Sequence, residues 1–591
     1  MDETLGKVSP TKEPCSIYPS VRGIDCGNFQ LPAEGLTSEQ RKIALDQLFK
    51  YLSTQKSHFL GYQLNQQLDY EEDLKAYLNY QINNIGDPFG SGFLTTNTKF
   101  MERAVLDYYA SLWNARWPHD PQDIESYWGY VLTMGSSEGN LYGLWNARDY
   151  LAGKVLLEEP GSKEKAQQAS LDGNPRSVQP RLMYQQAYAP KGNPHAYTPV
   201  AFYSEDTHYS LVKGVRVLNI STFNQIGSGQ FECPLKYPED YPNCFSEQYI
   251  DANGWPLEVP SNEHGEIYIP ALVKLVECFA SKGYPILVCF NYGTTFKGAY
   301  DDVEAAGKAL VPILRKYNLY ERNVEYSPDC EDTRNGFWFH VDAALGGTYM
   351  PFIEMAYDDK TIDRRGPNFD FRLPFIHSIV TSGHKWDGAP WPCGIYMTKV
   401  KFQLRPPDSP EYLGSQDTTF AGSRNGFSAM ILWDYLAKNS YSTQIEKALR
   451  AQKMAQYAYD QLQQLERKLQ KELWVDRTPL ALTVRFKRPN EDILFKYSLS
   501  CENLYVNGQE RKYAHIFTMP HVTENLIQQL IEDLSQKGAF EEPEDLELLR
   551  SSDTEEPEDL ELLRLSDTEE IATETNTRKL VYVPHIGRGF N

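Results

Sequence analysis

A single lysine, Lys385, stands in the stretch TSGHKWDG, directly after the apolar run FIHSIV. An amine at the end of a buried strand is partly desolvated. It therefore loses its proton more easily than a free lysine and becomes a nucleophile toward carbonyl groups. Taken alone, the same pattern also fits a surface lysine in a loop. The residues at the ends of the other apolar runs decide between these two interpretations.

A carboxylate, Asp342, follows a second apolar run, FWFHV. A buried carboxylate without a partner is costly, so Asp342 needs a charged or hydrogen-bonding group beside it. The small residues that follow in AALGG, among them Ala344, leave room for a flat group. This end of the run therefore offers an acid next to an open space.

A phosphate-binding turn is indicated by MGSSEGNLYGLW, which follows the apolar run YWGYVLT. Gly135 permits a tight turn, and Ser136 and Ser137 stand where a helix begins, so that their hydroxyl and N–H groups can bind phosphate. An ordinary helix cap would explain the same pattern. His208, after VAFYS, and Thr295, after PILVCF, also fit either a site or plain structural roles.

The five apolar runs alternate with helical stretches between about residues 86 and 398, which predicts a mostly parallel sheet covered by helices on both faces. Ligands of such sheets bind outside the carboxyl ends of the strands. A lysine, a carboxylate, phosphate donors and room for a flat ring at that edge are the components of a pyridoxal phosphate site. The sequence therefore predicts an α/β enzyme that uses this cofactor.

Four segments are predicted along the chain. Residues 1–85 form an N-terminal segment with a helical arm, 86–398 the large cofactor-binding domain, 399–540 a lid loop and a small α+β domain, and 541–591 an acidic tail with a 14-residue duplication. Two insertions, at about 154–197 and 225–265, lack apolar periodicity. They are expected to lie on the surface and to bury nothing.

The charge of the chain excludes some classes of partner. The net charge is −22, and residues 541–570 alone carry 14 acidic residues against two arginines, a net charge of −12. The remainder is mildly acidic, which argues against nucleic acid. With no apolar run of membrane-spanning length and nine scattered cysteines without metal-ligand spacing, we expect a cytoplasmic protein with reduced thiols, no membrane contact and no metal.

Seven motifs resemble those of the group II pyridoxal-phosphate-dependent amino-acid decarboxylases, in the same order. They are NNIGDPF, GSSEGNLYGLW, DTHYS, NYGTTFKGAYDD, HVDAALGG, SGHKW and GSRNG. The resemblance covers about residues 59–530 and is greatest to the branch of histidine and serine decarboxylases and of aliphatic (methionine and valine) amino-acid decarboxylases. It implies a fold-type I enzyme that acts as a homodimer with shared active sites.

By this resemblance Lys385 would form the Schiff base with pyridoxal phosphate, and Asp342 would pair with the pyridinium nitrogen. Ala344 would pack under the ring, and His208 would stack on its other face. Thr295 would lie near the substrate carboxylate. The phosphate would be held by Ser136, Ser137, Ser382 and His384, and Ser423 in AGSRNG would reach the phosphate of the neighbouring protomer.

The implied reaction is α-decarboxylation of an L-amino acid to its amine and carbon dioxide. Tyr412, in RPPDSPEYLGSQDTTFAG, resembles the lid tyrosine that serves as proton donor, although the loop differs in composition from that of aromatic amino-acid decarboxylases. A packing tyrosine remains the alternative. A different reaction on the same scaffold is a further alternative, and a tyrosine at this position favours plain decarboxylation.

The substrate side chain is predicted from HFLGYQLNQ, which contains no lysine or arginine and so disfavours an acidic substrate. Leu60 and Tyr62 suit an apolar side chain, and Gln63 offers one neutral hydrogen-bonding group unless it merely caps a helix. We expect L-methionine, valine or leucine, with histidine as the alternative. A non-catalytic scaffold with an acidic interaction tail is the remaining hypothesis, but such a protein would not need Lys385 together with Asp342.

Overall fold

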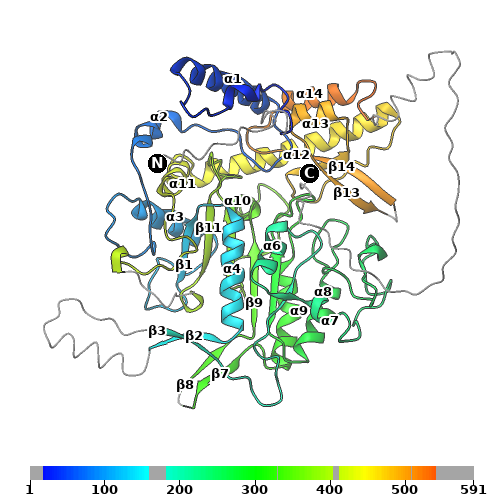
Figure 1. Ribbon diagram of the computed structural model, residues 1–591. Coiled ribbons are helices and arrows are strands. Elements are labelled where there is room, and N and C mark those ends of the chain that lie inside the picture. Colours follow the sequence, from blue (N-terminus) through cyan, green and yellow to red (C-terminus); the bar gives the residue numbers. More distant parts are fainter. Residues whose placement is uncertain (1–17, 159–181, 329, 404–410, 507–508, 541–591) are drawn as a thin grey trace, which may run out of the picture. The chain divides into compact units, whose positions relative to one another are not determined.

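The computed structural model describes residues 18–158, 182–328, 330–403, 411–506 and 509–540 (Figure 1). Its centre is a seven-stranded sheet with the order β1-β11-β10-β9-β6-β4-β5. The strands are β1 (Tyr127–Leu132), β4 (Val200–Phe202), β5 (Ser221–Thr222), β6 (Ile286–Asn291), β9 (Phe337–Asp342), β10 (Ser378–Ser382) and β11 (Gly394–Lys399). The strands from β10 to β5 are parallel, and β11 runs antiparallel to both its neighbours. The predicted mostly parallel sheet is thus confirmed.

Strand β9 presents different residues to the two faces of the sheet. Its side chains alternate between the faces, as in any strand. Phe337, Phe339 and Val341 enter the largest hydrophobic cluster. Trp338 enters a second cluster together with residues of α4 (Ser136–Leu151) and α6 (Tyr209–Val217), so His340 and Asp342 belong to that second face. The strand therefore carries both a core stripe and a polar stripe.

Helices cover both faces of the sheet. The side of the largest cluster is covered by α3 (Lys99–Leu112), α8 (Ile269–Ala280), α9 (Val303–Lys316), α10 (Gly346–Asp358) and α11 (Gly426–Lys438). On the other face, α4 runs across the sheet beside β9 (Figure 1). Two glycines permit this close approach, because a Cβ at Gly139 would lie 2.2 Å from Val380 and one at Gly143 would lie 2.9 Å from His340.

The N-terminal segment is helical, as its spacing predicts. It contains η2 (Cys26–Phe29), α1 (Ser38–Ser57), α2 (Glu71–Leu74) and η3 (Lys75–Asn79). Thr37 and Gln40 form a capping box at the start of α1. Among the helices of the described ranges, none is long and apolar enough to cross a membrane.

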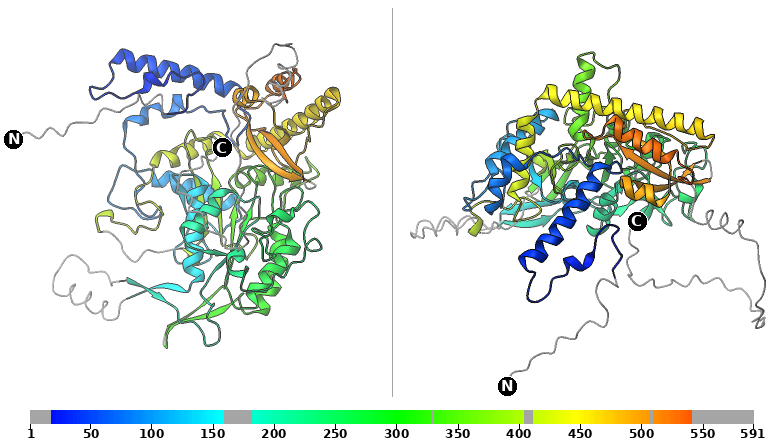
Figure 2. Two further views of the ribbon diagram at one scale, coloured as in Figure 1. Left: turned by 45° about the vertical axis from the view of Figure 1, so that its right-hand side comes forward. Right: turned by 90° about the horizontal axis from the view of Figure 1, so that it is seen from above.

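The C-terminal region contains a three-stranded antiparallel sheet against helices (Figure 2). Its elements are α12 (Tyr441–Leu469), β12 (Thr483–Lys487), α13 (Glu491–Tyr497), β13 (Ser500–Val506), β14 (Gln509–Phe517) and α14 (Glu524–Leu534). The predicted helical run over about 431–469 is two helices, because Asn439 ends α11 and Ser440 caps α12. The acidic duplicated tail lies outside the described residues.

The second insertion contradicts the prediction that it buries nothing. Leu235, Tyr241, Phe245, Trp255 and Val259 are all less than 9% exposed and belong to the largest hydrophobic cluster. These large side chains reach the core from a segment built mainly of turns and short helices, α7 (Phe223–Gly227) and η4 (Glu247–Tyr249). Burial here needs no regular periodicity, which is why the sequence pattern missed it.

Smaller elements complete the described part. Two antiparallel hairpins are formed by β2 (Lys154–Glu158) with β3 (Leu182–Gln186) and by β7 (Arg322–Ser327) with β8 (Cys330–Arg334). The first hairpin falls within the first predicted insertion. Single 3-10 turns occur at η5 (Val400–Phe402) and η6 (Glu411–Leu413).

Candidate active site

Lys385 follows the carboxyl end of β10 and lies half-buried beside the N-terminal segment. Its Nζ donates a hydrogen bond to Oε1 of Gln63 at 2.5 Å. The backbone holds the same two segments together, because the N–H of Asn65 donates to the carbonyl of Lys385 at 3.1 Å. The predicted lysine and the predicted substrate residue Gln63 are therefore in direct contact.

Burial lowers the pKa of Lys385 to about 8, although the nearby charge of Asp342 acts in the opposite direction. At pH 7 this lowered pKa leaves a larger fraction of the amine neutral than in an ordinary lysine. The structure thus favours the nucleophilic form of this amine.

Only one of the two polar atoms of the Gln63 amide, Oε1, has a hydrogen-bond partner among the described residues. The residue is 6% exposed, and among the described residues no group hydrogen-bonds to its Nε2. A buried amide donor without a partner is costly, so Nε2 is suited to contact a bound molecule. The alternative that Gln63 merely caps a helix does not account for its contact with Lys385.

Asp342 ends β9 and is 6% exposed. Its Oδ1 accepts a hydrogen bond from the N–H of Ala344 at 3.1 Å, and its Oδ2 accepts one from Nδ2 of Asn140 at 2.7 Å. These donors stabilise the charged carboxylate in a buried place. Ala344 itself is 8% exposed, and its small side chain leaves room beside the carboxylate.

The start of α4 brings polar groups together near the end of β10. Gly135 has φ +68°, and a Cβ at this position would lie 2.7 Å from Cε1 of His384. The N–H of Ser136 points to Oγ of the buried Ser382 at 3.3 Å. The exposed Ser137 completes the first turn of this 16-residue helix. A helix N-terminus with hydroxyl groups is suited to bind a phosphate.

His208 caps α6 and lies half-buried on the same side of the sheet. Its Nδ1 contacts Oγ of Ser210 at 2.8 Å and accepts from the N–H of Ser210 at 3.3 Å. Burial lowers its pKa, and the charges of Lys385 and Lys213 add to this effect, whereas Asp342 opposes it. The imidazole is therefore kept neutral.

Three segments meet on the substrate side through His515. Its ring stacks on Phe296 at 4.4 Å, its Nδ1 lies 3.2 Å from the carbonyl of Phe296, and its Nε2 lies 3.1 Å from the carbonyl of Gly61. Thr295 and Tyr62, the neighbours of Phe296 and Gly61, are both exposed. This contact joins the segment of Thr295 to that of Gln63.

Leu60, predicted to contact the substrate side chain, is packed against the C-terminal region. It is fully buried in the hydrophobic cluster of the C-terminal region, and its backbone pairs with Tyr497 and Phe517. This placement supports a packing role for Leu60. From this segment the side chain of Gln63 and the backbone N–H of Asn65 contact Lys385.

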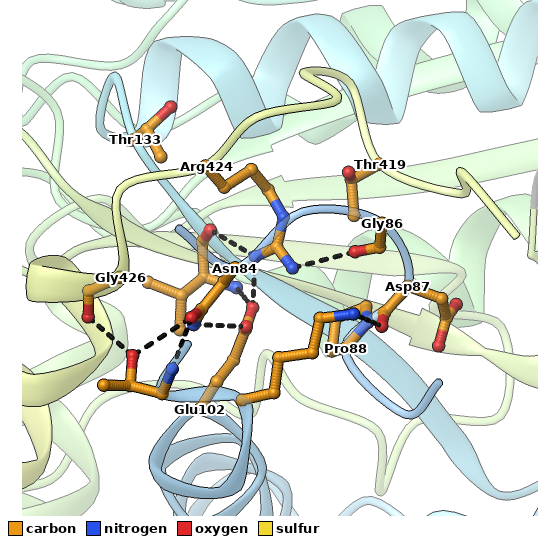
Figure 3. A network of polar contacts seen from close by, with 12 residues as sticks. Asn84, Gly86, Asp87, Pro88, Glu102, Thr133, Thr419, Arg424 and Gly426 are labelled. Carbon is orange, nitrogen blue, oxygen red and sulfur yellow. Dashed lines mark hydrogen bonds and ion pairs between the residues drawn. The ribbon is translucent and has the colours of Figure 1, made fainter. Parts of the chain in front are cut away.

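The GSRNG loop is held by a buried ion pair (Figure 3). Arg424 pairs with Glu102, and the two side chains are 1% and 0% exposed. Arg424 also donates to the carbonyl of Gly86 at 3.0 Å, and Nδ2 of Asn84 donates to Glu102 at 2.9 Å. The motifs NNIGDPF and GSRNG are thereby joined. The neighbouring Ser423 remains exposed.

Tyr412 lies in η6 and is 76% exposed, so it is not part of the buried group around Lys385. Asn140, Ser210 and Ser378 are residues of this region that the sequence analysis missed. Only Asn140 gave a usable signal, because it stands four residues after Ser136 and so lies on the same face of the helix. The cause of the omission was that an asparagine or serine inside an element is common for purely structural reasons.

The residues fit pyridoxal phosphate at both ends. A helix N-terminus with serine hydroxyls suits the phosphate, and the carboxylate of Asp342 suits the ring nitrogen. The half-satisfied amide of Gln63 and the amine of Lys385 stand where a bound molecule would meet them. No group of metal-ligating residues occurs within the described ranges.

Comparison with known proteins agrees with this geometry. Residues 256–481 match the pyridoxal-dependent decarboxylase conserved domain. The chain is 44% identical to L-methionine decarboxylase from Streptomyces sp. 590, solved in its internal aldimine form. That match has a TM-score of 0.77 and covers 87% of this chain and 98% of the other.

Curated relatives are more distant. Histidine decarboxylase of Solanum lycopersicum is 27% identical over 514 residues, which cover 86% of this chain and 92% of the relative. Serine decarboxylase 2 of Oryza sativa subsp. japonica is 25% identical over 511 residues, covering 86% and 81%.

The fold and the match to these proteins define a fold-type I, pyridoxal-phosphate-dependent enzyme that decarboxylates an amino acid. The chain belongs to the pyridoxal-dependent decarboxylase family.

Proposed function

We propose that this enzyme converts L-methionine, or a neutral aliphatic amino acid of similar size, to its amine and carbon dioxide. The observation that carries this proposal is the 44% identity to an L-methionine decarboxylase over nearly the whole of that protein. The identity to the histidine decarboxylase named above is 27%. Histidine is therefore the second candidate substrate.

Lys385 would hold the cofactor through its amine, and Asp342 would hold the ring nitrogen as an ion pair. Ala344 and His208 would lie on the two faces of the ring. Bound pyridoxal phosphate supplies an electron sink for the negative charge that remains on the α-carbon when carbon dioxide departs. The negative charge of Asp342 stabilises that sink.

The phosphate would be bound by residues at the start of α4 and after β10: Ser136, Ser137, Ser382 and His384. Thr295 would lie near the substrate carboxylate. Gln63 would use its free Nε2 to hold the bound substrate or cofactor while its Oε1 contacts Lys385. Tyr412 would have to move with its loop to donate a proton to the α-carbon, and a closed loop would exclude water.

The test is amine and carbon dioxide production by the purified, cofactor-loaded protein with each of the twenty L-amino acids. Lys385→Ala serves as the blank. We expect 3-(methylthio)propylamine from methionine as the dominant product. Histamine as the dominant product would establish the second candidate. Absence of any amine would refute decarboxylation of a common amino acid.

We also propose a cytoplasmic homodimer with shared active sites. Ser423 is exposed beside the buried Arg424, as a residue that reaches a second protomer must be. Large apolar side chains are exposed in the N-terminal part, with Phe49 at 75% and Leu78 at 68%. Exposed apolar side chains of this size are suited to be covered at a protein interface. The cysteines within the described ranges all have free thiols, which suits a reducing compartment.

Shared sites are testable by mixing two inactive variants, Lys385→Ala and Ser423→Glu. A heterodimer of these variants contains one site with both native residues. Random pairing restores about 25% of the wild-type sites, because half of the dimers are mixed and each has one intact site. No recovery of activity, with sedimentation showing mixed dimers, would place Ser423 in its own protomer's site or outside it.

A further inference from the structure

A continuous chain of hydrogen bonds lies beneath Asp342, on the α4 face of the sheet. We call it the Trp338 chain, and its members are Trp338, Ser378, His340, Asn140 and Asp342. The four successive distances are 3.0, 2.8, 2.8 and 2.7 Å. Every member is buried, and none is more than 6% exposed. Groups so deeply buried must satisfy one another.

The indole N–H of Trp338 fixes which groups donate and which accept at one end of the hydrogen-bond chain. The Nε1–H of Trp338 can only donate, so Oγ of Ser378 accepts from it. The hydroxyl of Ser378 then has its proton available for Nδ1 of His340. A neutral His340 that accepts at Nδ1 carries its proton on Nε2. Burial lowers the pKa of His340 to about 4, so the ring is neutral at pH 7.

The carboxylate of Asp342 requires the same order of donors and acceptors at the other end of the hydrogen-bond chain. Nε2–H of His340 donates to Oδ1 of Asn140, which turns the NH2 group of the amide toward Oδ2 of Asp342. An ionised carboxylate only accepts, so the opposite orientation of Asn140 would place two oxygen atoms against each other. Both ends of the chain therefore require the same orientation of the amide.

A branch leads from Asn140 to His208. The same Nδ2 donates to Oγ of Ser210 at 3.0 Å. The hydroxyl and the backbone N–H of Ser210 both meet Nδ1 of His208, at 2.8 and 3.3 Å. Nδ1 of His208 therefore accepts, and its proton is on Nε2. One amide thus contacts the carboxylate directly and the imidazole through a single hydroxyl.

We propose that the Trp338 chain is a positioning device that turns the NH2 group of Asn140 toward both Asp342 and Ser210. It keeps Asp342 an oriented anion for the cofactor ring and His208 a neutral ring with its proton on Nε2. Asn140, His340, Ser378 and Trp338 are positioning residues that act through Asp342 and Ser210. This inference rests on the proposed roles of Asp342 and His208.

The test compares Asn140→Asp with Asn140→Ala. Aspartate keeps the shape of asparagine but replaces the donor by a second carboxylate, whereas alanine removes both the donor to Asp342 and the acceptor of His340 without adding a charge. We expect the affinity of the apo full-length protein for pyridoxal phosphate to fall about tenfold in Asn140→Ala, from one lost hydrogen bond to a charged group. It falls about 100-fold or more in Asn140→Asp, where two carboxylates face each other. If Asn140 served packing alone, the isosteric aspartate would be the milder change.

Asn146→Asp is the matched control, because Asn146 is a buried asparagine of the same helix that donates to the carbonyl of Phe402 instead. It is expected to lower the melting temperature of the apo protein and to leave cofactor affinity unchanged. Trp338→Phe removes the remote N–H together with part of the buried indole ring, and it is expected to weaken cofactor binding about threefold. Unchanged cofactor affinity in this variant would show that the N–H of Trp338 does not fix the order of donors and acceptors along the chain.

The remaining outcomes separate this inference from the proposed function. Asp342→Asn with normal affinity and normal turnover would refute the proposed role of Asp342, and the chain with it. An impaired Asp342→Asn, together with an Asn140→Ala more damaging than Asn140→Asp, would refute only the positioning role. The absorbance spectrum of the bound cofactor gives a second readout, because it reports the protonation of the ring, which a packing defect does not change.

Discussion

Replacing Arg424 by methionine should leave the carboxylate of Glu102 charged and buried without its ion-pair partner. Arg424 and Glu102 are both within 1% of complete burial. Without Arg424, the carboxylate retains two hydrogen-bond donors among the described residues, Nδ2 of Asn84 and the N–H of Val131, both at 2.9 Å. Breaking one partner of a buried ion pair costs about 3–5 kcal/mol. We therefore expect the free energy of unfolding of Arg424→Met to fall by that amount.

The Arg424–Glu102 pair lies against strand β1, where water cannot replace the hydrogen bonds lost with Arg424. Strand β1 is an edge strand, and at Val131 its outward N–H is bonded by Glu102 and its outward carbonyl by Arg424 at 3.3 Å. The two side chains thus occupy the hydrogen-bonding positions of a missing neighbouring strand. Arg424→Met leaves the carbonyl of Val131 without this donor as well.

The assay is urea unfolding followed by tryptophan fluorescence, with a double variant as the decisive comparison. Glu102→Gln added to Arg424→Met removes the stranded charge and keeps an acceptor for Val131. It should restore about 1–3 kcal/mol. A double variant no more stable than Arg424→Met would refute the reasoning. Lys308→Met is the control, because its ion pair with Glu304 is on the surface and should contribute less than about 0.5 kcal/mol.

Three further predictions concern the active site. Because the pKa of Lys385 is lowered to about 8, attachment of cofactor to the apo protein should accelerate with pH up to about 8 and then level off, as measured by stopped-flow absorbance. A rate that still rises above pH 9 would contradict that pKa. Asp342→Asn should lower kcat about 100-fold or more while cofactor affinity falls less, since the carboxylate acts mainly on the charge developed during reaction. A loss of cofactor affinity with unchanged kcat at saturating cofactor would assign Asp342 to binding alone. Tyr412→Phe should reduce amine formation about 100-fold at unchanged cofactor affinity; full activity would make Tyr412 a packing residue.

Much of the sheet could be predicted from the sequence, because buried parallel strands are short continuous apolar runs. YWGYVLT, VAFYS, PILVCF, FWFHV and FIHSIV each contain or overlap a strand. The same reasoning brought Lys385 and Asp342 to one edge, since the ends of such strands share one side of the sheet. β11 was missed although GIYMTK is also apolar, because an antiparallel strand between β1 and β10 depends on a chain reversal that no local pattern encodes.

Residues that depend on tertiary contacts were less accessible. The burial of Trp255 arises from a segment without periodicity, and Leu60 is buried where its backbone pairs with Tyr497 and Phe517, more than 400 residues later in the chain. The position of Asn140 on the same helix face as Ser136 was a usable signal, but its role could not be predicted from it, because that role depends on a helix that approaches the sheet closely enough for the amide to reach Asp342. Gly139 and Gly143, which permit that approach, were visible in the sequence but not interpretable alone.

The apolar and polar faces of β9 limit which substitutions, insertions and deletions this strand tolerates. Substitutions at Phe337, Phe339 or Val341 alter only the apolar core on one side, and compensating substitutions can restore its volume. An insertion or deletion of a single residue within the strand cannot be compensated by further substitutions in this way. It would exchange the faces of every residue beyond it, so that Asp342 would turn into the hydrophobic core and an apolar residue toward the cofactor. We expect natural variants of this enzyme to tolerate length changes in the surrounding loops and none between Phe337 and Asp342.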